Sequence, residues 1–376
     1  MKIGILTQPL VNNYGGLLQN YALQTLLKRE GHIVCTLDWS WVLNNTFKSK
    51  IIKLLFYFRG VKPKDVYIPT LEEDLVIHKN VYHFRDTYIN HTSKFTSVQD
   101  FSNYDLEQKP DAYIVGSDQC WRPKYNPFQG AMFLNFVYRH DIKRVAYAAS
   151  FGTDEWEFKG NQYALLTKKF DLVTVREQSG IKLCKDYLGV EAHHVLDPTL
   201  LLDKEDYVDL IKAEEHTPSR GNLFYYILDP NPEIDEVIKH IGLKLNLVPF
   251  MVLPKFKEEY RLKEHIKNHI SDCVYPSPTK WLQGIMDAEM TIVDSFHGMV
   301  FSIIFNKPFW VIGNAARGMS RFLSLLKLFG LEHRLVTIQE LGKVNLFEKI
   351  DWTSVNAIKE QKKQESISLL LNALKK

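Results

Sequence analysis

One stretch of this 376-residue chain decides the fold expected for it: Thr291-Ile292-Val293-Asp294-Ser295-Phe296-His297-Gly298, followed directly by an apolar segment. A short β-rich run ends in polar residues, and a helix-like segment begins. In an open α/β sheet, this pattern places Ser295, His297 and Gly298 at the carboxyl end of a parallel strand, where ligands bind. The N–H groups and positive dipole end of the following helix point at the same place. The stretch therefore favours an anion site.

The histidine in this stretch has two possible uses at such a position. An imidazole can donate a hydrogen bond to a phosphate group or move a proton. The alternative is a histidine that only caps a buried turn, and these eight residues alone do not distinguish the two.

The rest of the chain alternates strands and helices. Strands are expected at residues 2–7, 32–38, 112–115, 145–149, 172–175 and 194–196, and then at 223–228, 247–252, 291–293 and 308–312. Helices are expected at 17–30, 232–245, 279–287, 321–329 and 354–374, and a loop at 11–16. A polar, turn-rich link near 214–221 separates the two sets. We predict an α/β protein with two Rossmann-like, doubly wound domains facing a cleft, over residues 1–205 and 206–353, and a terminal helix over 354–376.

Composition limits the class of protein. The chain is 45% hydrophobic and 24% charged, as in an ordinary folded protein, and its length suits two domains. A net charge of +3 without a run of Lys or Arg argues against a nucleic-acid partner. The four cysteines are scattered and form no Cys-x-x-Cys pair, no His or carboxylate cluster has metal-site spacing, and no signal peptide or membrane span is evident. We expect a cytoplasmic protein without a metal.

Residues 45–101 interrupt the alternation as an insertion in the first domain. Within it, residues 47–64 mix apolar and aromatic side chains with Lys and Arg. Such a stretch can make peripheral contact with a membrane at its inner face. We prefer the alternative, an insertion that packs its aromatic side on the first domain.

Other polar residues occupy corresponding strand ends. Asn13, Gly15 and Gly16 lie between the first predicted strand and helix, where a phosphate-binding turn would lie. The segment is neither G-x-G-x-x-G nor a P-loop, and it can also be only a tight connection. Ser117 and Asp118 follow the strand at 112–115, where the alternative is an Asx-type cap.

Arginines follow two further strands. Arg176 comes after the strand at 172–175 and can hold a carboxylate or phosphate, unless it only pairs with Glu177 on the surface. Arg317 and Arg321 follow the strand at 308–312, and Arg321 can also be a solvated helix-start residue.

Five motifs in this order resemble the polysaccharide pyruvyl transferase family: Asn13-Tyr14-Gly15-Gly16 with Gln19-x-Tyr21-Ala22-Leu23, Gly116-Ser117-Asp118-Gln119-x-Trp121, Val175-Arg176-Glu177, Leu196-Asp197-Pro198-Thr199 and Asp294-Ser295-Phe296-His297-Gly298. The resemblance spans roughly residues 3–335 without the insertion. It implies a GT-B-like pair of Rossmann-like domains, with a terminal helix that crosses back to the first.

The resemblance also implies a reaction. Family members move the three-carbon unit of phosphoenolpyruvate onto two hydroxyls of a sugar, as a cyclic ketal on a cell-surface polysaccharide or its lipid- or nucleotide-linked precursor. Phosphoenolpyruvate is then the donor substrate, and no cofactor is expected. The donor carries roughly three negative charges, so its site needs cations or N–H donors. By resemblance, His297 and Arg176 bind the donor, and Asp118 orients or deprotonates the acceptor hydroxyl.

One position departs from the family pattern. Many members carry Arg two residues before the histidine, where this chain has Ser295. We expect Arg317 or Arg321 to supply the missing cation beside His297, with Arg321 preferred. Two other functions stay open: a GT-B-type glycosyltransferase that uses a nucleotide sugar, and a non-catalytic subunit of a polysaccharide assembly machine.

Overall fold

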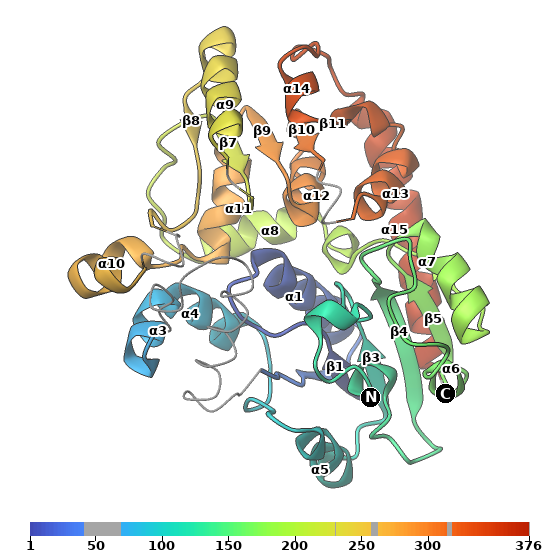
Figure 1. The fold of residues 1–376 in the computed structure, drawn as a ribbon. Coiled ribbons are helices and arrows are strands. Elements are labelled where there is room, and N and C mark those ends of the chain that lie inside the picture. The colour runs from blue at the N-terminus through green and yellow to red at the C-terminus, as the bar shows by residue number, and fades with distance from the viewer. Residues whose placement is uncertain (41–68, 230, 257–261, 314–317, 376) are drawn as a thin grey trace.

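The computed structural model describes residues 1–40, 69–229, 231–256, 262–313 and 318–375, and their strands form two sheets (Figure 1). The strands are β1 (Lys2–Leu6), β2 (Ile33–Thr36), β3 (Ala112–Val115), β4 (Lys143–Ala149), β5 (Leu172–Val175), β6 (His193–His194), β7 (Leu223–Tyr226), β8 (Pro249–Phe250), β9 (Met290–Val293), β10 (Phe309–Ile312) and β11 (Leu335–Val336). The sheet orders are β2-β1-β3-β4-β5-β6 and β11-β10-β9-β7-β8, with parallel pairing throughout. The central strands β3, β9 and β10 are buried along their whole length and mostly apolar, as expected where helices cover both faces of a parallel sheet.

The helices connect and cover these strands: α1 (Tyr14–Arg29), α3 (Leu71–Ile77), α4 (Lys79–Tyr88), α5 (Val98–Gln108), α6 (Ala164–Thr167), α7 (Gln178–Leu183), α8 (Lys204–Lys212), α9 (Pro232–Leu245), α10 (Leu262–His269), α11 (Pro278–Asp287), α12 (Phe296–Ile304), α13 (Ser320–Leu328), α14 (Ile338–Leu341) and α15 (Trp352–Leu374). The predicted α/β architecture with two parallel sheets is confirmed. Three of the four edge strands, β6, β8 and β11, are only two residues long, so the predicted strands at 194–196 and 247–252 were too long.

The terminal helix α15 returns to the first sheet, as expected. Figure 1 shows it running beside β4 and β5, far from the second sheet that precedes it in the chain. The Ser366 hydroxyl of α15 accepts a hydrogen bond from the Leu196 backbone N–H at 3.1 Å. Lys363 of the same helix pairs with Asp203 at 2.6 Å.

Helix α1 begins earlier than the sequence suggested. Asn13 caps it, with its side-chain oxygen accepting from the Gly16 N–H at 3.1 Å, so the predicted loop at 11–16 ends at Asn13. Two glycines have poor helix propensity and suggested a later start, but the cap and burial of the first turn outweigh that preference.

Helix α1 also joins the two domains. It lies between the two sheets in Figure 1, and the Tyr14 hydroxyl donates to the Pro276 carbonyl at 2.8 Å. Leu17 and Leu18 belong to the same buried apolar cluster as Trp281 of α11 and Phe301 of α12. The domains therefore share one continuous core beside the site.

The described part of the insertion contacts both domains. Phe84 of α4 packs edge-on against Tyr21 of α1, with ring centroids 6.2 Å apart. The Tyr275 N–H of the second domain donates to the Ile77 carbonyl of α3 at 2.9 Å. The basic stretch at 47–64, with its predicted membrane contact, lies outside the described residues.

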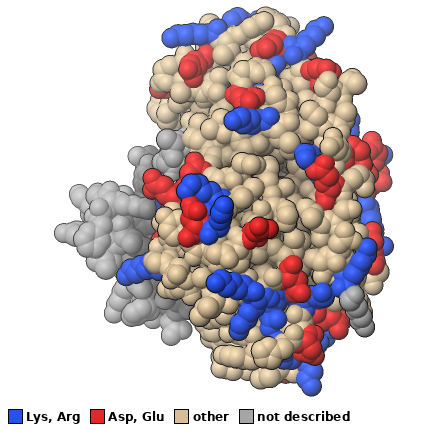
Figure 2. Space-filling view, turned by 90° about the vertical axis from the view of Figure 1, so that its right-hand side faces the viewer, with Lys and Arg blue, Asp and Glu red and all other residues tan. Residues whose placement is uncertain are grey.

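The surface carries mixed charge. On the face in Figure 2, the Lys and Arg side chains are interspersed with Asp and Glu rather than gathered by sign. Among the described residues, none of the helices combines the length and the apolar character needed to cross a bilayer.

Candidate active site

The turn from β9 to α12 positions His297. Ser295 caps the helix, and its hydroxyl accepts from the Gly298 N–H at 3.0 Å. A Cβ at Gly298 would lie 2.7 Å from that hydroxyl and 3.0 Å from Val293, so the tight turn needs glycine. His297 consequently lies in the first helical turn, beside N–H groups that lack partners within the helix.

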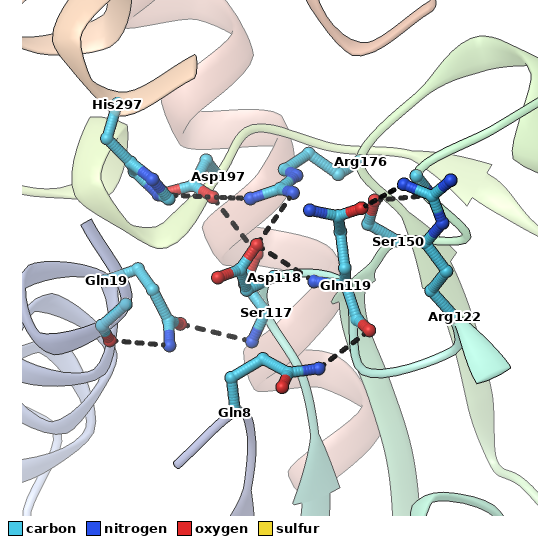
Figure 3. A network of polar contacts seen from close by, with 12 residues as sticks. Gln8, Gln19, Ser117, Asp118, Gln119, Arg122, Ser150, Arg176, Asp197 and His297 are labelled. Carbon is cyan, nitrogen blue, oxygen red and sulfur yellow. Dashed lines mark hydrogen bonds and ion pairs between the residues drawn. The ribbon is translucent and has the colours of Figure 1, made fainter. Parts of the chain in front are cut away.

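The His297 ring contacts the first domain on two sides. A Cβ built on Gly15 of α1 would come within 2.0 Å of Nδ1, so the ring lies directly on that glycine. Its Nε2 is buried without a hydrogen bond and lies 3.6 Å from Asp197 Oδ2. Figure 3 shows His297 and Asp197 in one network with Arg176 and Asp118.

Asp197 is the buried anion at the centre of this network. Its Oδ2 accepts from the Ser117 hydroxyl and from Arg176 Nη1, both at 3.0 Å. Its Oδ1 accepts from the backbone N–H and the hydroxyl of Thr199, at 3.1 and 2.7 Å. Burial alone raises the pKa of Asp197, but His297 and Arg176 outweigh it and hold that pKa far below its usual range. Asp197 is therefore ionised at neutral pH.

Asp118 is the second carboxylate of the network. Arg176 Nη2 and the Gln119 N–H donate to its Oδ1 at 3.1 and 2.9 Å, and Asn13 Nδ2 donates to its Oδ2 at 3.2 Å. Its φ of +67° is unusual for a residue with a side chain, as found at functional turns. Burial raises the pKa of Asp118, yet Arg176 and His297 bring it below its ordinary value. Asp118 is an anion and a weak base, better suited to orienting a hydroxyl than to deprotonating it.

Arg176 holds the two carboxylates in place. Its side chain is 1% exposed and bridges Asp118 and Asp197, with its guanidinium 4.5 Å from the centre of the Phe296 ring. It does not line the cavity described next. The alternative of a surface pair with Glu177 does not apply, since both residues are buried.

A cavity of about 640 Å³ lies where the two domains meet. Most of the predicted site residues line it: Asn13, Gly15, Asp118, Ser295, His297 and Arg321. Aromatic side chains, including Tyr226 and Trp281, form part of the second-domain wall.

Other predicted residues lie behind this lining. Ser117 is fully buried, and its hydroxyl donates to Asp197 and to the Ala148 carbonyl at 3.1 Å. Gly16 and Gly298 complete the two helix caps described above. Arg317 lies outside the described residues.

Arg321 brings a cation into the cavity from α13. It is only 8% exposed, so it is not a solvated helix-start residue. Burial and the nearby Arg176 lower the pKa of Arg321 to about 10, while Asp118 and Glu177 oppose that effect. The guanidinium stays charged at neutral pH.

Asp197 and Gln19 belong to motifs of the family resemblance but were not among the predicted site residues. Asp197 follows β6 as Asp118 follows β3, so the strand-end pattern contained the signal. Gln19 lies inside α1, where it donates to Thr7 Oγ1 and the Gly16 carbonyl, both at 2.9 Å, and accepts from the Ser117 N–H. Its place in the Gln19-x-Tyr21-Ala22-Leu23 motif was the signal in the sequence. In the described part of the chain, no group of three His, Cys, Asp or Glu side chains is close enough to hold a metal ion.

The sequence profile described as polysaccharide pyruvyl transferase matches residues 13–315 of this chain. The chain belongs to the polysaccharide pyruvyl transferase family. The matched range holds every cavity-lining residue predicted from the sequence except Arg321, which follows it. No curated protein is significantly similar to this family member in sequence.

Solved structures share the fold of this pyruvyl transferase family member. UDP-GlcNAc 2-epimerase from Methanocaldococcus jannaschii, in complex with UDP-GlcNAc and UDP, is 12% identical, with a TM-score of 0.51 over 99% of both chains. A putative UDP-N-acetylglucosamine 2-epimerase from Listeria monocytogenes is 9% identical, with a TM-score of 0.52 over 98% of this chain and 90% of its own. The likeness confirms the GT-B-like arrangement of the two domains.

Proposed function

We propose that this chain transfers the three-carbon unit of phosphoenolpyruvate to two hydroxyls of a saccharide and forms a cyclic pyruvate ketal during cell-surface polysaccharide synthesis. The observation that carries the proposal is the meeting of His297, at the start of α12, with Arg321 in one cavity between the domains. Family membership supports the transferase class. The donor, the acceptor and the cell-surface role are our inference.

The polar end of the cavity suits a small trianion. Arg321 contributes a positive charge, and His297 contributes a ring N–H when protonated. The starts of α1 and α12 both reach the cavity, through Gly15 and Ser295, and add the positive ends of two helix dipoles. In this arrangement Arg321 replaces the cation that many relatives place at the Ser295 position.

The proposed reaction needs one proton donor and two nucleophilic hydroxyls. His297 gives a proton to the methylene carbon, which becomes a methyl group and leaves an oxocarbenium-like centre at the adjacent carbon. The first sugar hydroxyl attacks this centre, and its proton returns to His297. The second hydroxyl attacks the same carbon as the bond to phosphate breaks, and its proton leaves with the phosphate. The Asp118 carboxylate orients the hydroxyl and stabilises the developing positive charge.

The aromatic wall suits the acceptor. Tyr226 and Tyr275 line the second-domain side of the cavity, and the buried ring of Trp281 packs against that of Tyr226 with ring centroids 5.3 Å apart. Aromatic rings pack against the C–H face of a sugar, while a few polar groups fix its hydroxyls. The saccharide would therefore lie between this wall and Asp118.

A ligand comparison tests the donor. Phosphoenolpyruvate at about 100 times its dissociation constant is expected to raise the free energy of unfolding by about 2.7 kcal/mol, measured as a thermal shift. UDP and UDP-GlcNAc, each at the same concentration as phosphoenolpyruvate, are expected to give a smaller thermal shift. A larger shift with the nucleotides would favour the glycosyltransferase function.

An activity assay tests the role of the histidine. His297→Ala is expected to reduce acceptor-dependent phosphate release on the order of 10²-fold, because it removes the proton donor. His240→Ala, an exposed histidine of α9, is the matched control and is expected to keep the wild-type rate. Equal rates for the two variants would contradict the assignment.

A further inference from the structure

The two nitrogens of the His297 ring have different surroundings. Nε2 is enclosed by protein, makes no hydrogen bond, and lies 3.6 Å from Asp197 Oδ2. Nδ1 is the ring atom closest to the Cβ position of Gly15, a residue that lines the cavity. Nε2 is fully enclosed beside a fixed negative charge, whereas Nδ1 is not enclosed in this way and belongs to a side chain that lines the cavity. The Nδ1 edge of the ring, next to Gly15, is therefore the one that a donor in the cavity can reach.

Asp197 cannot turn away from the ring. It precedes the short 3₁₀ helix Pro198–Leu201, and its Oδ1 is held by both hydrogen-bond donors of Thr199. The Ser117 hydroxyl and Arg176 Nη1 both donate to Oδ2. The carboxylate thus has one orientation, and its Oδ2 is the charged atom directed at Nε2.

We propose that Asp197 is a positioning residue that keeps a proton on Nε2 of His297 and so presents Nδ1 to the donor. A carboxylate beside one imidazole nitrogen fixes the tautomer because it accepts only from an N–H group. The protonated ring then gives the Nδ1 proton to the methylene carbon and remains neutral with its Nε2 proton in place. Asp197 stays ionised throughout and touches no substrate.

The role in catalysis that we infer for Asp197 rests on the proposed function. The tautomer that we expect for His297 does not depend on it. The decisive measurement is the ¹⁵N NMR spectrum of the full-length protein labelled at histidine, recorded at a pH where His297 is neutral. The His297 signals are assigned by their loss in His297→Gln. We expect a protonated Nε2 and an unprotonated Nδ1 in the wild-type protein. A proton on Nδ1 of neutral His297 in the wild-type protein would overturn the inference, regardless of the results obtained with the variants.

Asp197→Asn tests the cause. We expect the fraction of ring protonated on Nδ1 to rise and kcat to fall on the order of 10²-fold, while KM for phosphoenolpyruvate changes less than about threefold. Asp118→Asn removes the neighbouring carboxylate and is expected to leave the tautomer unchanged. An unchanged tautomer in Asp197→Asn would contradict the inference. If the wild-type protein has the expected tautomer but no acceptor supports turnover, the proposed function fails and the positioning role of Asp197 stands.

Discussion

At the scale of single residues, the electrostatics of the cavity depend on which charged side chains face it and which lie behind it. Arg176 pairs with two carboxylates and does not line the cavity, so in this structure its charge compensates theirs. Arg321 lines the cavity and remains protonated. Among the described residues that line the cavity, Arg321 is the permanent cation that the proposed donor would meet.

Arg321→Gln is expected to weaken phosphoenolpyruvate binding by about 10- to 100-fold, the usual loss for a hydrogen bond to a charged group. Lys327→Gln is the matched control, because it removes the same charge from the exposed side of α13. Isothermal titration calorimetry gives both affinities. Losses of equal size in the two variants would mean that general electrostatics, not a contact in the cavity, attracts the donor.

At the scale of an element, the first turn of α1 forms both a helix cap and a wall of the site. Gly15→Ala would place a Cβ 2.0 Å from His297 Nδ1, and the ring would have to move. Gly16→Ala would place a Cβ 2.9 Å from the end of the Asn13 side chain, which can move more easily. Both substitutions replace glycine by alanine, whose helix propensity is more favourable by up to about 1 kcal/mol of helix-forming free energy.

The expected result is a turnover reduced on the order of 10²-fold in Gly15→Ala and much less in Gly16→Ala, because only the first displaces the proton donor. The rate of phosphate release and the melting temperature are the measurements. Full activity in Gly15→Ala would show that His297 does not need its position on α1.

At the scale of the whole molecule, the carboxylates at the domain junction make stability depend on pH. The pKa of Asp118 is lower in the folded protein than its ordinary value, so its contribution to stability is complete above the unfolded pKa of about 3.9. That contribution is lost as the pH falls from there through the folded pKa. Asp118→Asn is thus expected to lower the free energy of unfolding most at neutral pH, with the difference shrinking below about pH 4. Urea unfolding at several pH values measures it, and a difference independent of pH would contradict the pKa shift.

The sequence alone determined the architecture and most of the strand ends. Short apolar runs alternating with helical periodicity specify parallel strands and crossover helices, because both features are local. Polar residues at the carboxyl ends of such strands must gather at one edge of a sheet. For that reason His297, Asp118, Asn13 and Gly15 could be named as site candidates from their place in the sequence.

Only the tertiary structure decided which of these residues open into the cavity. The packing of α1 against α11 and α12 sets the position of one domain on the other, and that packing comes from non-directional apolar contacts spread over the chain. It places Gly15 and Asp197 on two sides of His297, brings Arg321 into the cavity and leaves Arg176 behind it. No local pattern encodes such a relation, because the site is formed by side chains from two domains that are far apart in the sequence.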